Sequence, residues 1–206
     1  MNTREPLLKP VAIADMRPTQ ITVGFREVDQ KRKHFRGLAA ESEGAFLGRH
    51  MIPCVLGPGE RHFIIDNHHL ARALHEEGVV EVLTTVVADL RALSKSSFWT
   101  YLDNRSWCHP YDADGRRTDF FAIPSSVAKL ADDPYRSLAG ELRHLGGFAK
   151  DTAPFSEFLW ADFFRKRLKS KALAKNFSRC LSKAMVMAKS HEAAYLPGWC
   201  GPDPIA

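Results

Sequence analysis

The stretch Phe63-Ile64-Ile65-Asp66-Asn67-His68-His69-Leu70-Ala71-Arg72-Ala73-Leu74 joins an apolar segment to a helical pattern. The apolar residues predict a strand that ends at Asp66 and the turn-forming Asn67. The spacing after them predicts a helix from Leu70 to Glu77, closed by Gly78. The start of a helix favours anions, phosphate in particular, because its first backbone N–H groups have no partner within the helix. We therefore expect a phosphate site at residues 66–69, called the box below.

Each polar residue of the box has a chemical and a structural interpretation. His68 and His69 would donate hydrogen bonds to phosphate or act as acid and base. Asp66 would orient a histidine or hold Mg²⁺ or another divalent cation, and Asn67 and Arg72 would add phosphate contacts. In the structural alternative Asp66 caps the helix, the histidines pack, and Arg72 is a solvated helix residue.

The segments around the box predict a small α+β core. Residues 54–56 and 62–65 read as two strands joined by the Gly-Pro turn at residues 57–60, and residues 79–89 read as a further strand. Short extended pieces are expected at residues 11–15 and 21–23. A charged helix is expected from Glu27 to Leu38, stopped near Gly37.

The composition suits one globular domain with a helical extension. The chain has 206 residues, 45% of them apolar, and a formal net charge of +5. No stretch approaches the ~20 apolar residues that span a bilayer, and no apolar leader is visible, so we expect a cytoplasmic protein without a membrane partner. Residues 1–9 are expected to be loose. The four scattered cysteines predict free thiols, and their spacing gives no support for a zinc site with His68, His69 or His109.

Residues 93–196 are predicted to be mostly helical and packed on a core formed by residues 10–92. Helices are expected at residues 95–102, 126–130, 137–145 and 154–169. Beyond them, Lys171, Lys175, Arg179 and Lys183 recur every four residues and would form one basic row on a helix. Such a row could follow the phosphates of a nucleic acid; the alternative is an ordinary solvated face.

Four segments of the chain resemble the ParB/sulfiredoxin superfamily, and most closely its ParB-like nucleases. The box is similar to the family's Asp-Gly-His-His-Arg motif, and the other segments are residues 16–28, 133–139 and 154–163, so that the resemblance covers about residues 10–170. It implies the ParB/sulfiredoxin fold, a small mixed sheet with helices. It also implies a protein that binds nucleotide or nucleic-acid phosphate at the box, with nuclease or phosphoryl-transfer activity.

The chain departs from the superfamily pattern at three positions. Asn67 replaces the glycine of the box, and Leu70 replaces its arginine, which removes a bidentate phosphate donor. Gln20 stands where superfamily members that phosphorylate free serine have a glutamate as general base, so that activity is not expected. Glu27 is the nearest alternative base, or else a helix-start carboxylate. Gly24 would let the backbone approach a ligand, or would serve a turn.

Two hypotheses of different class follow. The first is an enzyme acting at phosphate through Asp66, His68 and His69, with Glu27 as a further acid or base and a divalent cation or a nucleotide as cofactor. The second is a non-enzymatic module that binds DNA or a nucleotide. The missing general base at Gln20 and the missing box arginine at Leu70 favour the second hypothesis. The paired histidines beside an acid favour the first.

Overall fold

The apolar segments around the box form strands of one mixed sheet in the computed structural model, which describes residues 10–202 apart from the side chains of residues 39–45. The strands are β1 (Pro10–Ala12), β3 (Ile52–Gly57), β4 (Arg61–Ile64) and β5 (Glu81–Asp89), in the order β1-β5-β3-β4. β3 is parallel to β5, and the other neighbours are antiparallel. The predicted hairpin is confirmed: Cys54 lies opposite Ile64, and Gly59 and Glu60 turn the chain with φ of 73° and 60°. Residues 1–9, expected to be loose, lie outside the described residues.

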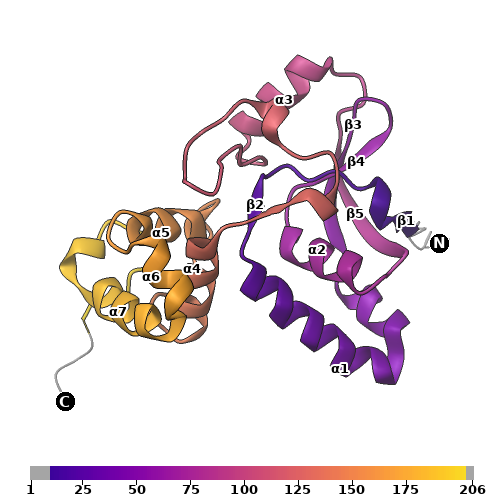
Figure 1. Cartoon of the computed structure of the whole chain (residues 1–206). Coiled ribbons are helices and arrows are strands. Elements are labelled where there is room, and N and C mark those ends of the chain that lie inside the picture. The colour runs from indigo at the N-terminus through magenta and orange to yellow at the C-terminus, as the bar shows by residue number, and fades with distance from the viewer. Residues whose placement is uncertain (1–9, 203–206) are drawn as a thin grey trace, which may run out of the picture. The chain divides into compact units, whose positions relative to one another are not determined.

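The chain divides into two units, whose described residues are 10–21, 28–110 and 119–130 in the first, and 22–27, 111–118 and 131–202 in the second. The first unit contains the sheet, and its helices include α2 (His68–Glu76), α3 (Lys95–Asn104) and the 3-10 helices Ile13–Asp15, Phe120–Ala122 and Val127–Lys129. α2 ends as predicted, because Gly78 takes a φ of 76° just beyond its last turn. The α+β class with a small mixed sheet is therefore confirmed (Figure 1).

Helix α1 is twice as long as predicted. It runs from Phe25 to Arg49, so the expected stop near Gly37 is wrong. A glycine inside a helix costs only about 1 kcal/mol relative to alanine. Beyond it the buried ring of Phe46 packs edge-on against that of Phe35, 5.2 Å between centroids. Burial of this aromatic pair offsets the glycine.

The second unit is mainly helical. It contains the parallel strands β2 (Thr22–Val23) and β6 (Ala131–Asp132), the helices α4 (Pro134–His144), α5 (Ser156–Arg165), α6 (Ser170–Lys175) and α7 (Phe177–Lys189), and the 3-10 helix His191–Ala193. α4 packs on α5 and α7 around a core that includes Leu138, Trp160, Phe164 and Ala184. None of the described helices is both long and apolar enough to span a membrane.

The expected single basic helix is wrong, because α6 ends at Lys175 and α7 begins at Phe177. Asn176 separates them, and its side chain accepts a hydrogen bond from the Arg179 N–H at 2.9 Å. Asparagine favours this capping position because its carbonyl satisfies an N–H group that the new helix leaves unpaired. The pattern of cations at every fourth residue continues through the break, but the helix does not.

The units do not follow the division at residue 92 that was expected from the sequence. α3 and the residues from 119 to 130 belong to the first unit, and residues 22–27 belong to the second. The predicted packing of the C-terminal part on the core stays a prediction.

Candidate functional site

The box lies at the start of α2 in the first unit. Asn67 takes the left-handed conformation with φ of 63°, and its N–H donates to the Asp66 carboxylate at 2.6 Å. Asp66 is exposed, whereas His68 and His69 are the first two residues of α2 and only 4% and 7% exposed. The left-handed turn directs the chain from the strand into the helix, as expected for an asparagine.

His68 is engaged inside the protein. Its Nε2 accepts a hydrogen bond from the backbone N–H of Thr19 at 3.1 Å, and the Thr19 hydroxyl donates to the Ile64 carbonyl at 2.6 Å. Burial lowers the pKa of His68 to about 3; a hydrogen bond with the Ile64 backbone raises it, and nearby His109 lowers it further. A neutral ring whose acceptor nitrogen binds a backbone N–H ties α2 to the segment around Thr19.

Thr19 connects the box to a third histidine. The His109 N–H donates to the Thr19 carbonyl at 2.8 Å, and Gln20 and His109 form a parallel bridge. The sequence had singled out His109 and Gln20 for chemical reasons, but nothing in it marks Thr19. Its contact with His68 spans 49 positions of the chain and depends on the tertiary fold.

Arg72 also has partners within the first unit. Its Nε donates to Glu76 at 2.6 Å, and its Nη1 donates to the carbonyls of Val127 and Leu130, each at 3.2 Å. These contacts fasten the 3-10 helix Val127–Lys129 to α2. A phosphate at Arg72 would have to compete with them.

Gly24 and Glu27 lie in the second unit, in contrast to the box residues. A Cβ at Gly24 would lie 2.8 Å from the backbone nitrogen of Ser137, so the glycine permits a close approach to α4. The Glu27 carboxylate pairs with Nη1 of the buried Arg136 at 3.2 Å, and Glu157 pairs with the other side of the same guanidinium. Glu27 thus balances a buried cation, as an ion pair in a protein interior requires.

The four C-terminal cations are all exposed, with Lys171 and Lys175 on α6 and Arg179 and Lys183 on α7. Their contact with nucleic acid stays a prediction.

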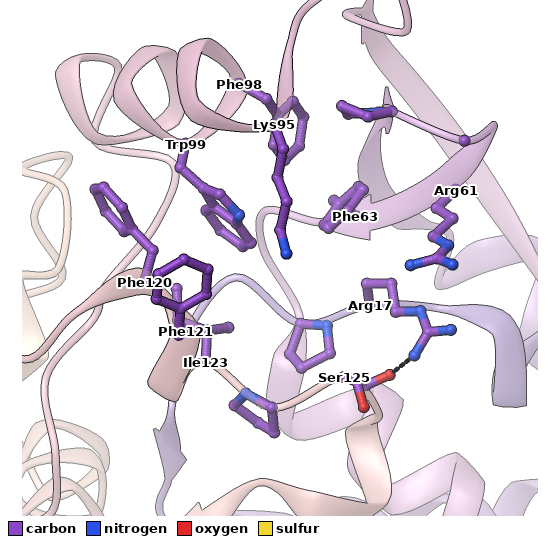
Figure 2. A pocket seen from close by; sticks show the side chains of 14 residues that line it. Arg17, Arg61, Phe63, Lys95, Phe98, Trp99, Phe120, Phe121, Ile123 and Ser125 are labelled. Carbon is purple, nitrogen blue, oxygen red and sulfur yellow. Dashed lines mark hydrogen bonds between the residues drawn. The ribbon is translucent and has the colours of Figure 1, made fainter.

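A cavity of about 460 Å³ in the first unit was not predicted from the sequence. Figure 2 shows the 14 residues that line it: Arg17, Pro18, Pro58, Gly59, Arg61, Phe63, Lys95, Phe98, Trp99, Phe120, Phe121, Ile123, Pro124 and Ser125. They come from the β3–β4 hairpin, from α3, from the 3-10 helix Phe120–Ala122 and from two loops, residues 17–18 and 123–125. The aromatic doublets Phe98-Trp99 and Phe120-Phe121 are the only trace of this cavity in the sequence. They lie far apart in the chain, and only the fold brings them together.

Local capping places the side chains of this cavity. The Ser94 hydroxyl accepts from the Ser97 N–H at 3.1 Å, which starts α3 at Lys95 and puts Trp99 one turn later. The Asp119 carboxylate accepts from the Phe121 N–H at 3.0 Å and starts the 3-10 helix that carries Phe120 and Phe121. Serine and aspartate favour such helix starts because their oxygens satisfy N–H groups that the helix leaves free.

The cavity has an aromatic wall. The rings of Phe63 and Phe98 lie 4.6 Å apart, and those of Trp99 and Phe120 are stacked at 5.7 Å with an interplanar angle of 11°. Gly57 allows this packing, because a Cβ there would lie 2.5 Å from the Phe63 ring and 2.8 Å from the Phe98 ring.

The charged side chains of the cavity are all cationic. Arg61 and Lys95 are exposed, Arg17 is half-buried and donates to the Ser125 carbonyl, and the described lining residues include no Asp or Glu. Figure 2 shows Arg17 and Arg61 on one side of the cavity and Trp99, Phe120 and Phe121 on the other. Such a site suits an anion attached to a flat ring.

The described part of the chain bears on two further kinds of chemistry, metal binding and thiol reactivity. It contains no group of three or more His, Cys, Asp or Glu side chains arranged to hold a metal ion. The predicted divalent cation stays a prediction. Cys54, Cys108, Cys180 and Cys200 are free, as expected, and burial raises the pKa of the Cys54 thiol, which disfavours a reactive thiolate.

Comparisons with known proteins agree with the resemblance. A family model described as "Putative ParB-like nuclease" matches residues 9–166. The solved structure titled "Crystal structure of protein Atu1540 from Agrobacterium tumefaciens" is 48% identical, with a TM-score of 0.88, and the similarity covers 96% of this chain and 100% of that one. A search of the curated proteins finds no match. The family model spans well over half of the chain, which therefore belongs to the family described as "Putative ParB-like nuclease".

Proposed function

We propose that the chain binds the phosphates of a nucleic acid or nucleotide through Arg17, Arg61 and Lys95. The observation that carries this proposal is the cavity, whose charged lining residues are all cations. Among the described residues of the cavity no carboxylate lines the wall beside these cations, although Asp15 and Glu60 line an adjacent pocket together with Arg17 and Arg61. A wall whose charges are all positive attracts phosphate. The family description and the net charge of +5 support the same ligand class.

Binding is favoured over acid–base chemistry at His68. A general acid or base works best when its pKa lies near the operating pH. Burial lowers the pKa of His68 to about 3, and its Nε2 already accepts the Thr19 N–H. The Glu27 carboxylate is already engaged in an ion pair with the buried guanidinium of Arg136, and it belongs to the second unit, whereas the box belongs to the first.

Cleavage of a phosphate ester at the box is the second candidate function. The family description names a nuclease, and Asp66 presents an exposed carboxylate next to the first turn of α2. In this proposal Asp66 holds a divalent cation, and the first-turn N–H groups with Asn67 and His69 hold the phosphate.

The binding proposal is tested by fluorescence anisotropy with a labelled oligonucleotide of about 20 nucleotides at low salt. We expect Arg61→Gln combined with Lys95→Gln to weaken binding about tenfold or more, since charge-assisted contacts contribute roughly 1.5–3 kcal/mol each. The matched control combines Lys33→Gln with Lys129→Gln, two exposed cations of the same unit that do not line the cavity. If both double substitutions weaken binding equally, the effect is due to the change in net charge, and a binding site at the cavity is contradicted.

Cleavage is tested on the same oligonucleotide with Mg²⁺ or Mn²⁺, by following the length of an end-labelled strand. If the box is catalytic, Asp66→Asn abolishes product formation while leaving the anisotropy signal intact. The control is Asp151→Asn, because Asp151 is also exposed and lies in a loop of the second unit. Product formation unchanged by Asp66→Asn would exclude the box as the catalytic site.

A further inference from the structure

We propose that the cavity takes an unpaired nucleobase, so that the chain prefers single-stranded nucleic acid to duplex. This inference rests on the proposed function, because it names the part of the ligand that enters between the phosphate-binding cations. Two features of the cavity support it, the aromatic wall and an exposed aromatic ring at its edge.

The wall offers stacking surfaces of the right kind. Phe63, Trp99 and Phe120 are each only partly buried, so their rings are in reach of a ligand, and Phe98 supports them from the core. Trp99 and Phe120 lie nearly parallel, at an interplanar angle of 11°. Flat aromatic surfaces beside cations are the features with which proteins hold single strands, since every base has a face that can stack.

Phe121 extends the aromatic surface to the outside. The residue is 81% exposed, the highest exposure among the large hydrophobic residues described, and the Lys95 ammonium lies 5.2 Å from the centroid of its ring. A phenyl ring in water gains nothing from folding by hydrophobic burial. The same ring beside a cation would stack a second base of a strand whose phosphate binds Lys95.

The size of the cavity favours a single unpaired base over a duplex. A volume of about 460 Å³ is within the range of small-ligand pockets and admits one base with its sugar. A base within a duplex has both faces covered by its neighbours and cannot enter without leaving the stack. The cavity therefore distinguishes unpaired from paired bases, whereas phosphate contacts alone would not.

The experiment compares three labelled ligands of equal strand length, about 12 nucleotides, by anisotropy at low salt: oligothymidine, an abasic strand with the same phosphates, and a duplex. We expect oligothymidine to bind about tenfold or more tightly than the other two, the effect of one stacked base. Equal binding of oligothymidine and the abasic strand, or tighter binding of the duplex, would overturn the base-binding proposal and leave phosphate binding standing. If none of the three binds, the proposed function fails as well.

Variants locate the stacking surface. Phe121→Ala should weaken binding of oligothymidine about tenfold and leave the abasic strand unaffected. Tyr195→Ala is the control, because Tyr195 is also strongly exposed, at 73%, and lies outside the cavity. An unchanged affinity of Phe121→Ala for oligothymidine contradicts the role of this ring.

A second readout uses the unaltered protein. A base stacked on Trp99 should quench part of the tryptophan fluorescence, with oligothymidine but not with the abasic strand, and Trp99→Phe should remove that change. Quenching by both ligands, or quenching that persists in Trp99→Phe, would overturn the assignment even if a variant with alanine failed to fold.

Discussion

His68 is a buried imidazole at the first position of α2, and its Nε2 accepts a hydrogen bond from the backbone N–H of Thr19 at 3.1 Å. Its pKa is lowered from the ordinary 6.5 to about 3, chiefly by burial. The unfolded chain takes up a proton as the pH falls below about 6.5, whereas the native ring stays neutral until about pH 3. The free energy of unfolding should therefore decrease by up to about 1.4 kcal/mol per pH unit as the pH falls through this window.

The measurement is urea unfolding between about pH 7.5 and pH 5. His68→Gln keeps an acceptor for the Thr19 N–H and cannot be protonated, so its stability should fall less steeply with pH than that of the parent chain. His144→Gln is the control, since His144 is exposed. Parallel pH profiles for His68→Gln and the parent chain would contradict a buried, neutral His68.

Two glycines of adjacent segments should respond to alanine in opposite directions. A methyl group at Gly24 would meet the Ser137 backbone at 2.8–2.9 Å, and overpacking of this kind costs about 1–3 kcal/mol. At Gly37, an exposed position within α1, a Cβ has no neighbour within 4 Å, and alanine should add up to about 1 kcal/mol of helix stability. Urea midpoints that shift the same way in both variants would contradict this account.

At the scale of elements, α4 depends on the capping carboxylate before it. Asp133 is 1% exposed and accepts from the N–H groups of Tyr135 and Arg136 at 2.9 and 3.2 Å, while Arg165 pairs with its other oxygen at 2.5 Å. Asp133→Ala removes the cap and leaves Arg165 without this partner, so we expect a loss of about 3–5 kcal/mol.

Asp133→Asn should cost less than Asp133→Ala, because the amide oxygen can still accept from the first turn of α4. The exposed Asp151, which accepts from the Ala153 N–H in a loop, provides the comparison, and Asp151→Ala should change stability by less than about 1 kcal/mol. Denaturant unfolding followed by circular dichroism measures all three. Equal losses for Asp133→Asn and Asp133→Ala would assign the whole effect to the ion pair.

The elements that the sequence predicts well are those whose signals are local. The β3–β4 hairpin follows from a Gly-Pro turn between apolar runs, and the end of α2 follows from Gly78. The stop expected at Gly37 is wrong because the packing of Phe46 decides the length of α1. The box was found from its pattern, but the partner of His68 and the cavity were not, since they depend on contacts between segments far apart in the chain.

At the scale of the whole molecule, the positive charge is distributed over both units. The cavity cations Arg17, Arg61 and Lys95 belong to the first unit, and the four C-terminal cations belong to the second. The break at Asn176 divides the C-terminal set into the pairs Lys171/Lys175 on α6 and Arg179/Lys183 on α7. The two pairs therefore lie on two different helices, which pack on one another, and not on one continuous helical row.

The salt dependence of binding separates these contributions. Each phosphate contact to a single strand contributes about 0.7 log units of affinity per log unit of salt, because binding releases condensed counterions. Replacing Arg61 and Lys95 with glutamine should lower the slope by about 1.4. If both C-terminal pairs contact the strand, glutamine at Lys171 and Lys175, or at Arg179 and Lys183, should lower it by a similar amount, and the effects of the two pairs should add. Anisotropy titrations between about 0.05 and 0.3 M salt measure the slopes. If neither C-terminal double substitution changes the slope, those cations form an ordinary solvated face. If the double substitution at Arg61 and Lys95 leaves the slope unchanged, the cavity does not contact the phosphates.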